Sequence, residues 1–201
     1  MNVYVESNFV LELALEQEEC DSCSELIQMA RGRRLQLVVP AFCLAEPHQA
    51  IVAKDKARKR FSADLKNHLG DLGRSKPHRD LPATADALSE TLIKRAQLER
   101  EGLQRTIDTL LETAFVIPLD SDLVGRGVQM ENHFGLTGQD AIVLASVLSH
   151  LKSSRPNESC FLSRNSKDFD DPDIRDELES LNCKFFASFG PASAYLKSRL
   201  Q

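Results

Sequence analysis

Acidic and amide side chains adjoin apolar segments at several places in this chain, where they could hold a metal ion. Glu6 and Glu46 each follow an apolar run, Asp140 precedes one, and Asn165 and Asp168 come shortly after another. Hard cations such as Mg²⁺ and Mn²⁺ bind oxygen ligands, which carboxylates at strand ends and helix starts supply. Metal-assisted phosphodiester chemistry is therefore our first hypothesis.

The elements that would position these side chains alternate regularly along the chain. Short apolar strands alternate with longer helical patterns, which is typical of an α/β fold with a mainly parallel sheet. We predict strands over residues 3–5, 37–39, 115–117, 160–162 and 184–186. We predict helices over residues 9–14, 22–31, 42–72, 83–114, 121–133, 139–151, 173–181 and 191–200. We expect Ser22 to be the N-cap of its helix, because Glu25 follows three residues later as in a capping box.

Two of the predicted helices are much longer than the others. They cover residues 42–72 and about 83–114, and a loop with Gly70, Gly73 and Pro77 separates them. We interpret them as a helical arm. The chain of 201 residues, 42% of them hydrophobic, is long enough for one sizeable core, so we expect a single domain over 1–201 with the arm inserted at about 42–114.

The predicted sheet offers a place where the acidic side chains could meet. In open α/β sheets, ligands bind beyond the carboxyl ends of the strands. Glu6 directly follows the first strand, and Asn165 and Asp168 follow the strand at 160–162, so their side chains meet if these two strands are neighbours. Each residue also has an ordinary interpretation: a helix cap for Asp140, a solvated first-turn residue for Glu46, and turn or cap residues for the other two.

The order and spacing of these residues resemble the PIN-domain family of metal-dependent ribonucleases over nearly the whole chain. The matching segments are Glu6-Ser7-Asn8 after the first strand, Glu46 in the helix after the second strand, Asp140 at the head of an Ala-rich apolar helix, and the run from Phe161 to Phe169. The resemblance implies a three-layer α/β/α fold with a central parallel sheet.

The chain departs from the family pattern at two places. The opening Asp is Glu6, whose side chain is one methylene longer. At the closing segment Asn165 stands where the family has a metal-binding Asp, and one extra residue lies between it and Asp168. A neutral amide and a longer carboxylate both matter for Mg²⁺, because its octahedral geometry is strict.

The resemblance implies hydrolysis of single-stranded RNA by a water that Mg²⁺ or Mn²⁺ activates. It implies a catalytic set made of Glu6, Glu46, Asp140, Asn165 and Asp168, all but Glu46 being metal ligands. Ser7, Asn8 and Ser163 would orient these groups, and Arg164 would meet the phosphate. An antitoxin-like inhibitor protein and a homodimer are further expectations that come from the family.

Two basic runs offer other contacts for nucleic acid. Residues 54–60 are most simply a solvated helix face. In the second run, Arg74, Lys76 and Arg79 lie in the loop of the arm, where they could grip phosphates. The net charge of −5 argues against a general polyanion-binding surface, so any such contact must be local.

Composition also bears on where the protein works. Five cysteines are poor material for a disulfide framework and suit a reducing compartment. We see no signal peptide and no apolar stretch near the roughly 20 residues that span a bilayer, so we expect a cytoplasmic protein without membrane contact.

Two alternatives to the nuclease stay open. The chain could be a catalytically weakened PIN-like module that binds RNA or another protein, for which Asn165 is the best indication. It could also be an unrelated α/β domain whose acidic residues match by coincidence.

Overall fold

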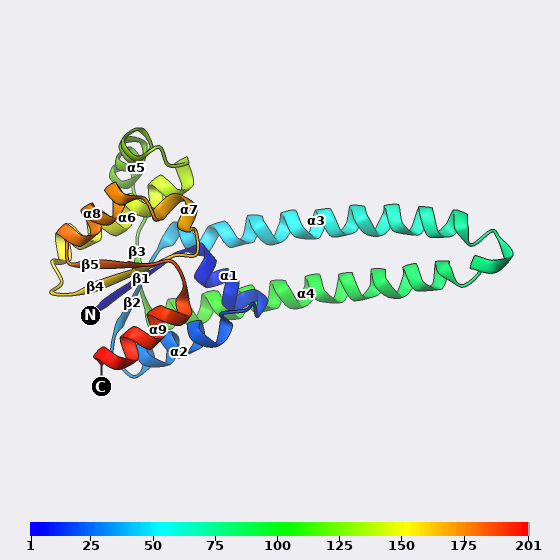
Figure 1. The fold of residues 1–201 in the computed structure, drawn as a ribbon, viewed down its shortest axis with the longest axis horizontal. Helices are drawn as coiled ribbons and strands as arrows, with labels where there is room; N and C mark the ends of the chain where they lie inside the picture. Colours follow the sequence, from blue (N-terminus) through cyan, green and yellow to red (C-terminus); the bar gives the residue numbers. More distant parts are fainter. Residues whose placement is uncertain (201) are drawn as a thin grey trace.

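A computed structural model describes residues 1–200 and shows a central sheet with helices on both faces (Figure 1). The strands are β1 (Asn2–Val5), β2 (Gln36–Pro40), β3 (Ala114–Ile117), β4 (Ser159–Leu162) and β5 (Cys183–Phe186). The helices are α1 (Ser7–Leu15), α2 (Cys20–Arg31), α3 (Ala41–Leu72), α4 (Leu81–Thr113), α5 (Ser121–Phe134), α6 (Gly138–Ser154), α7 (Ser166–Phe169), α8 (Pro172–Ser180) and α9 (Phe189–Arg199), with a 3-10 turn at Lys76–His78.

The sheet has the order β3-β2-β1-β4-β5, and all its strand pairs are parallel. Helices α6 and α8 lie on one side of it, and α2 and α9 lie on the other (Figure 1). This confirms the predicted three-layer α/β/α fold. Each predicted strand is found. The inner strands β1, β2 and β4 are almost completely buried, and such a strand is a short apolar run that stands out in the sequence.

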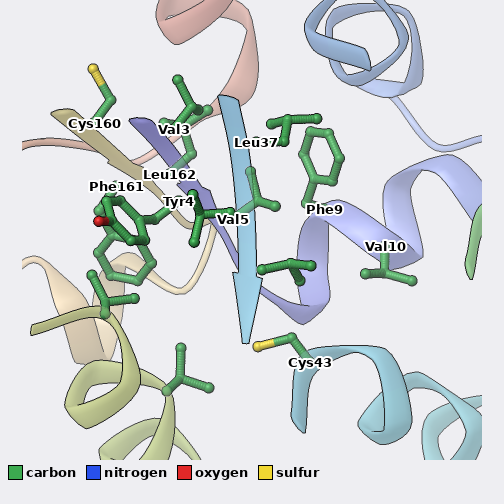
Figure 2. Packing of buried hydrophobic residues seen from close by; sticks show 14 of the residues in the cluster. Val3, Tyr4, Val5, Phe9, Val10, Leu37, Cys43, Cys160, Phe161 and Leu162 are labelled. Carbon is green, nitrogen blue, oxygen red and sulfur yellow. The ribbon is translucent and has the colours of Figure 1, made fainter. Parts of the chain in front are cut away.

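The core is built around β1, the middle strand. Val3, Tyr4 and Val5 have no exposed surface. In Figure 2 they lie between Leu37 of β2 and Phe161 of β4. Since a central strand packs against both layers, the residue that follows it leaves the core at a defined point. That residue is Glu6.

The predicted arm is a hairpin of α3 and α4 that projects from the body of the protein (Figure 1). Most buried positions on α4 lie three, four or seven residues apart, as in a coiled-coil seam: Ala85, Ser89, Ala96, Glu99, Leu103, Thr106 and Leu110, with Gly102 buried beside Leu103. Arg58 of α3 donates hydrogen bonds of 2.5 and 2.7 Å to Glu99, and Ser62 donates one of 2.6 Å to Ser89. The hydrogen bond from Arg58 lowers the pKa of the Glu99 carboxyl, so polar pairs as well as apolar contacts hold the two helices together.

The predicted start of α2 is wrong. The helix begins at Cys20, and Glu19 rather than Ser22 precedes its first turn. The carboxylate of Glu19 accepts hydrogen bonds from the backbone amides of Phe189 and Gly190 at 2.9 and 3.2 Å. Glu19 is therefore drawn to the first turn of α9, a contact between distant segments that local capping patterns do not reveal.

Among residues 1–200, no helix combines the length and the apolar character that crossing a membrane requires.

Candidate active site

The carboxyl ends of β1 and β4 lie side by side in the sheet. The two strands are paired with Val5 opposite Leu162, so Glu6 and Ser163 leave the sheet at the same edge. From β1 the chain builds β2 and β3 on one side, and it returns with β4 and β5 on the other. This reversal of strand order is where open α/β sheets bind their ligands.

A pocket of about 680 Å³ lies at this edge, and its lining is strongly acidic. Five carboxylates line it: Glu6, Glu12, Glu18, Glu46 and Asp140. Arg164 is the only Lys or Arg among the described residues that do so. Such a surplus of negative charge attracts cations and repels a phosphodiester unless a cation reduces it.

Glu6 is the most unusual of these carboxylates, because it is buried with one oxygen unpaired. It is the N-cap of α1, and its Oε2 accepts a hydrogen bond of 2.8 Å from the amide of Asn8. Its Oε1 is buried and has no hydrogen-bond partner among the described residues. Burial raises the pKa of Glu6 to about 7; Asn8 and Ser163 work against this shift, and the charge of Glu46 adds to it. Near neutral pH this carboxyl can hold a proton or a cation.

Glu46 reaches the pocket from the second turn of α3. Its Oε2 accepts a hydrogen bond from the hydroxyl of Ser7, which is buried at the start of α1. This contact joins the helix after β1 to the helix after β2. Glu46 is half-buried, so the structure does not support the interpretation that it is an ordinary solvated residue.

Asp140 lies in the first turn of α6 and is held from two sides. Its Oδ2 accepts a hydrogen bond of 2.7 Å from the hydroxyl of Thr137, and its Oδ1 accepts one of 3.1 Å from Nδ2 of Asn165. The backbone amide of Asn165 in turn donates to Oγ of Ser163 at 2.9 Å. The side-chain oxygen of Asn165 makes no hydrogen bond among the described residues, which leaves it available as a ligand.

Arg164 lines the pocket, but its guanidinium is already paired. It forms an ion pair with Glu12, which is almost fully buried in α1, and a second one of 3.4 Å with Glu18. The sequence interpretation missed Glu12, although a single acid inside the apolar run of α1 was a usable signal. The pair ties the loop after β4 to α1, so Arg164 positions the edge of the pocket.

The remaining predicted site residues lie outside the pocket lining. Ser163 is fully buried behind the pocket, where it holds Asn165. Asp168 is half-buried within α7 and does not line the pocket, whereas its neighbour Phe169 does. The extra residue after Asn165 is the physical reason, because the chain turns into α7 before Asp168 is reached.

Arg74, Lys76 and Arg79 are exposed at the tip of the arm. Figure 1 places this tip at the opposite end of α3 from Glu46. These residues are therefore not part of the pocket.

The donors of the pocket fit a hard divalent cation that keeps much of its water. Within residues 1–200, no three His, Cys, Asp or Glu side chains come close enough together to form a complete metal site. Mg²⁺ is usually held by one or two carboxylates and keeps several water ligands. The buried, unpaired Oε1 of Glu6 is the oxygen that such an ion would satisfy, with Asp140 and Asn165 as further donors.

One comparison with known proteins bears on the site. A family model described as a PIN domain matches residues 3–169. The matched segment runs from β1 to the end of α7 and includes every residue that lines the pocket. No curated protein matches the chain.

Proposed function

The chain belongs to the PIN-domain family, whose members are generally nucleases, and from this premise we propose that it is a metal-dependent endoribonuclease. The observation that carries the proposal is the unpaired, buried Oε1 of Glu6 in an acidic pocket at the reversal point of the sheet. Family membership supports a nuclease-type role on RNA, and the pocket supports the dependence on metal.

Glu6, Asp140 and Asn165 would hold a Mg²⁺ or Mn²⁺ ion, directly or through water. The bound ion lowers the pKa of a water molecule and neutralises charge on the phosphate. Glu6 is suited to this role because its Oε1 forms no hydrogen bond with any described residue that metal binding would have to break. Asp168, which lies outside the pocket lining, remains a predicted ligand only if it acts through water.

The other groups keep these ligands in place. Thr137 and Asn165 fix the two oxygens of Asp140, so this carboxylate presents one orientation. Ser7 holds the carboxylate of Glu46, which faces the same pocket and can accept a proton from a water molecule there. Asn8 fixes Oε2 of Glu6 and leaves Oε1 free.

The proposal is tested with purified protein and single-stranded RNA. We expect cleavage with Mn²⁺ or Mg²⁺, none with chelator, and none by an Asp140→Asn variant purified in the same way, which controls for contaminating nucleases. We also expect Mn²⁺ to raise the melting temperature of the wild type. No cleavage with any divalent metal, together with an unchanged melting temperature, would refute the proposal.

The Asn165→Asp variant is expected to bind metal more tightly and to be less stable without it. The substitution replaces the amide that donates to Asp140 by a second carboxylate, which costs about 1–2 kcal/mol when no cation is bound. With Mn²⁺ the added charge becomes a ligand, and we expect at least tenfold tighter binding and faster cleavage. Thermal melting with and without Mn²⁺ measures both effects. Asn157→Asp, at an exposed site, should show neither; a variant without the metal-free loss would contradict the prediction.

A second candidate function is an RNA-binding or protein-binding module with little turnover. It is favoured by the neutral Asn165 and by the finding that within residues 1–200 no three His, Cys, Asp or Glu side chains lie close enough together to form a metal site. RNA binding in chelator without cleavage in any metal would support it. The homodimer and the inhibitor protein stay predictions from the family.

A further inference from the structure

Positive charge is concentrated in one part of the arm. Residues 54–79, which cover most of α3 and the tip, contain nine of the 25 Lys and Arg residues of the chain but only three of its 30 Asp and Glu residues. The rest of the chain is therefore strongly acidic. Such a separation produces a local positive surface on a protein whose net charge is −5.

Several of these cations are not used to hold the hairpin together. Arg58 is paired with Glu99, Lys59 with Asp55, and Lys66 with Asp86. In contrast, a second group is exposed and forms no ion pair with any described residue: Lys54, Lys56, Arg60, Arg74, Lys76 and Arg79. Their charges are available to a ligand.

Two of the unpaired cations of α3, Lys56 and Arg60, lie on its outer face, about half a turn away from Arg58 and Ser62, which bond to α4. Lys56 and Arg60 are one turn apart on α3, and Arg74 follows two residues after the helix ends at Leu72. Between them the row contains the uncharged Ala63, Asn67 and Gly70, and the exposed Asp64 and Asp71 lie on the same face. From Lys56 to the end of the helix the row extends about 24 Å, at about 1.5 Å per residue.

This row starts near the pocket. Glu46, Pro47 and Ala50 line the pocket and belong to the same helix, α3. Lys56 follows Ala50 by about 9 Å along the helix. Arg60 is 14 residues after Glu46, about 3.9 turns, so it projects from nearly the same side of α3. Figure 1 shows α3 running outward from the body with α4 beside it along most of its length.

We propose that the outer face of α3, from Lys56 through Arg60 to Arg74 and the tip, is a track that binds the backbone of RNA continuing beyond the pocket. This inference rests on the proposed RNA substrate and specifies it: an RNA that extends many nucleotides past the cleaved bond. The track supplies the positive charge that the acidic pocket lacks. The two basic runs of the sequence, 54–60 and 74–79, are then parts of one surface.

The contacts would be to phosphates rather than to bases. Lys and Arg on a straight helix suit the regular charge of a nucleic-acid backbone. No Phe, Tyr or Trp lies on the row itself, and beside it Phe61, which is 59% exposed, offers a stacking surface for one base. An extended, regularly charged polyanion therefore fits the row better than a compact acidic protein surface. Binding should depend strongly on salt and little on sequence.

The test compares two variants of the full chain that each remove two charges from the hairpin. Lys56→Gln/Arg60→Gln removes them from the track, and Lys94→Gln/Arg105→Gln removes them from exposed positions on α4. Fluorescence anisotropy measures the binding of a labelled 20-nucleotide RNA and of a 4-nucleotide RNA in chelator, where no cleavage occurs. Melting temperatures show that both variants are folded.

We expect the track variant to bind the long RNA about tenfold more weakly and with a salt slope shallower by about 1.4, since each single-strand phosphate contact contributes about 0.7. The α4 variant should bind it like the wild type, and the short RNA should not distinguish the proteins. Equal losses in both variants, or none in the track variant, would overturn the proposal. The proposal would also be overturned if poly-glutamate competed with the labelled RNA as well as unlabelled RNA does, because the track would then fit an acidic protein surface. If RNA binding depends on the track but no metal supports cleavage, the proposed track is supported and the proposed nuclease activity is refuted.

Discussion

At pH 8 the Glu6→Gln variant is expected to be more stable than the wild type by about 3 kcal/mol and to lose its nuclease activity by at least a hundredfold. The gain arises because burial raises the pKa of Glu6 from 4.5 to about 7, so keeping this carboxyl ionised costs free energy in the folded state. The loss of activity arises because the neutral amide replaces the carboxylate that we propose as a metal ligand.

The pH dependence of this effect has a defined sign. Between about pH 4.5 and 7 the folded wild type keeps the Glu6 proton that the unfolded chain has released. Its free energy of unfolding therefore falls as pH rises through this window, whereas the amide side chain of the variant cannot titrate. Below about pH 4.5 the two proteins should be about equally stable. Urea unfolding at pH 4, 6 and 8 measures the difference, and Glu112→Gln, at an exposed site that forms no ion pair with any described residue, is the control.

The same measurement with Mn²⁺ separates the two roles of Glu6. A cation binds the ionised carboxyl, so Mn²⁺ should stabilise the wild type more at pH 8 than at pH 6 and should have little effect on Glu6→Gln. If Glu6→Gln were less stable than the wild type at pH 8, the conclusion that the Glu6 carboxylate is buried with an unpaired charge would be wrong. An equal Mn²⁺ effect on both proteins would contradict the assignment of Glu6 as a ligand.

Gly102→Ala is expected to destabilise the protein by about 2–3 kcal/mol, although alanine is the better helix former. Gly102 lies in α4 where α1 crosses it, and a Cβ atom there would overlap the carbonyl oxygen of Ala14. Either α1 or α4 must move to relieve this overlap. Since α1 begins at Ser7, directly after Glu6, a shift of α1 also disturbs the pocket.

Gly70→Ala is the matched control for this prediction. Gly70 is also helical, in α3, but a Cβ atom there would meet no other atom within 4 Å. Only the difference in helix propensity remains, so we expect a gain of up to about 1 kcal/mol. Denaturant unfolding of the two variants gives opposite signs. If both substitutions stabilised the protein, the close contact between α1 and α4 would be wrong.

The sequence alone indicated most of the fold and the family. Each strand is a short apolar run, and the arm is two long helical patterns on either side of a loop with Gly73 and Pro77. These periodic patterns depend only on residues close together in the sequence, so they can be recognised without knowing which element each one packs against. The start of α2 was predicted wrongly because Glu19, which precedes the helix, accepts hydrogen bonds from the distant first turn of α9.

The site was only partly visible in the sequence. Glu6, Glu46, Asp140 and Asn165 were predicted from their places next to apolar runs, and the structure brings all four to one pocket. Asp168 was predicted with them but lies outside the pocket lining, because α7 begins one residue after Asn165. Moving the start of a helix by one residue changes which side chain faces a site. The sequence pattern alone does not show at which residue the backbone turns into the helix.

What the sequence by itself determined is therefore the set of elements and the residue types at their ends. Only the tertiary structure decided that β4 lies beside β1, which joins Glu6 and Asn165 at one edge, and that Arg164 is taken by the buried Glu12. It also decided that Oε1 of Glu6 has no hydrogen-bond partner among residues 1–200, and that α3 leads from the pocket to exposed cations that form no ion pair with the described part of the chain. These properties depend on contacts between residues far apart in the chain, and such contacts exist only once the strands are ordered and the helices packed.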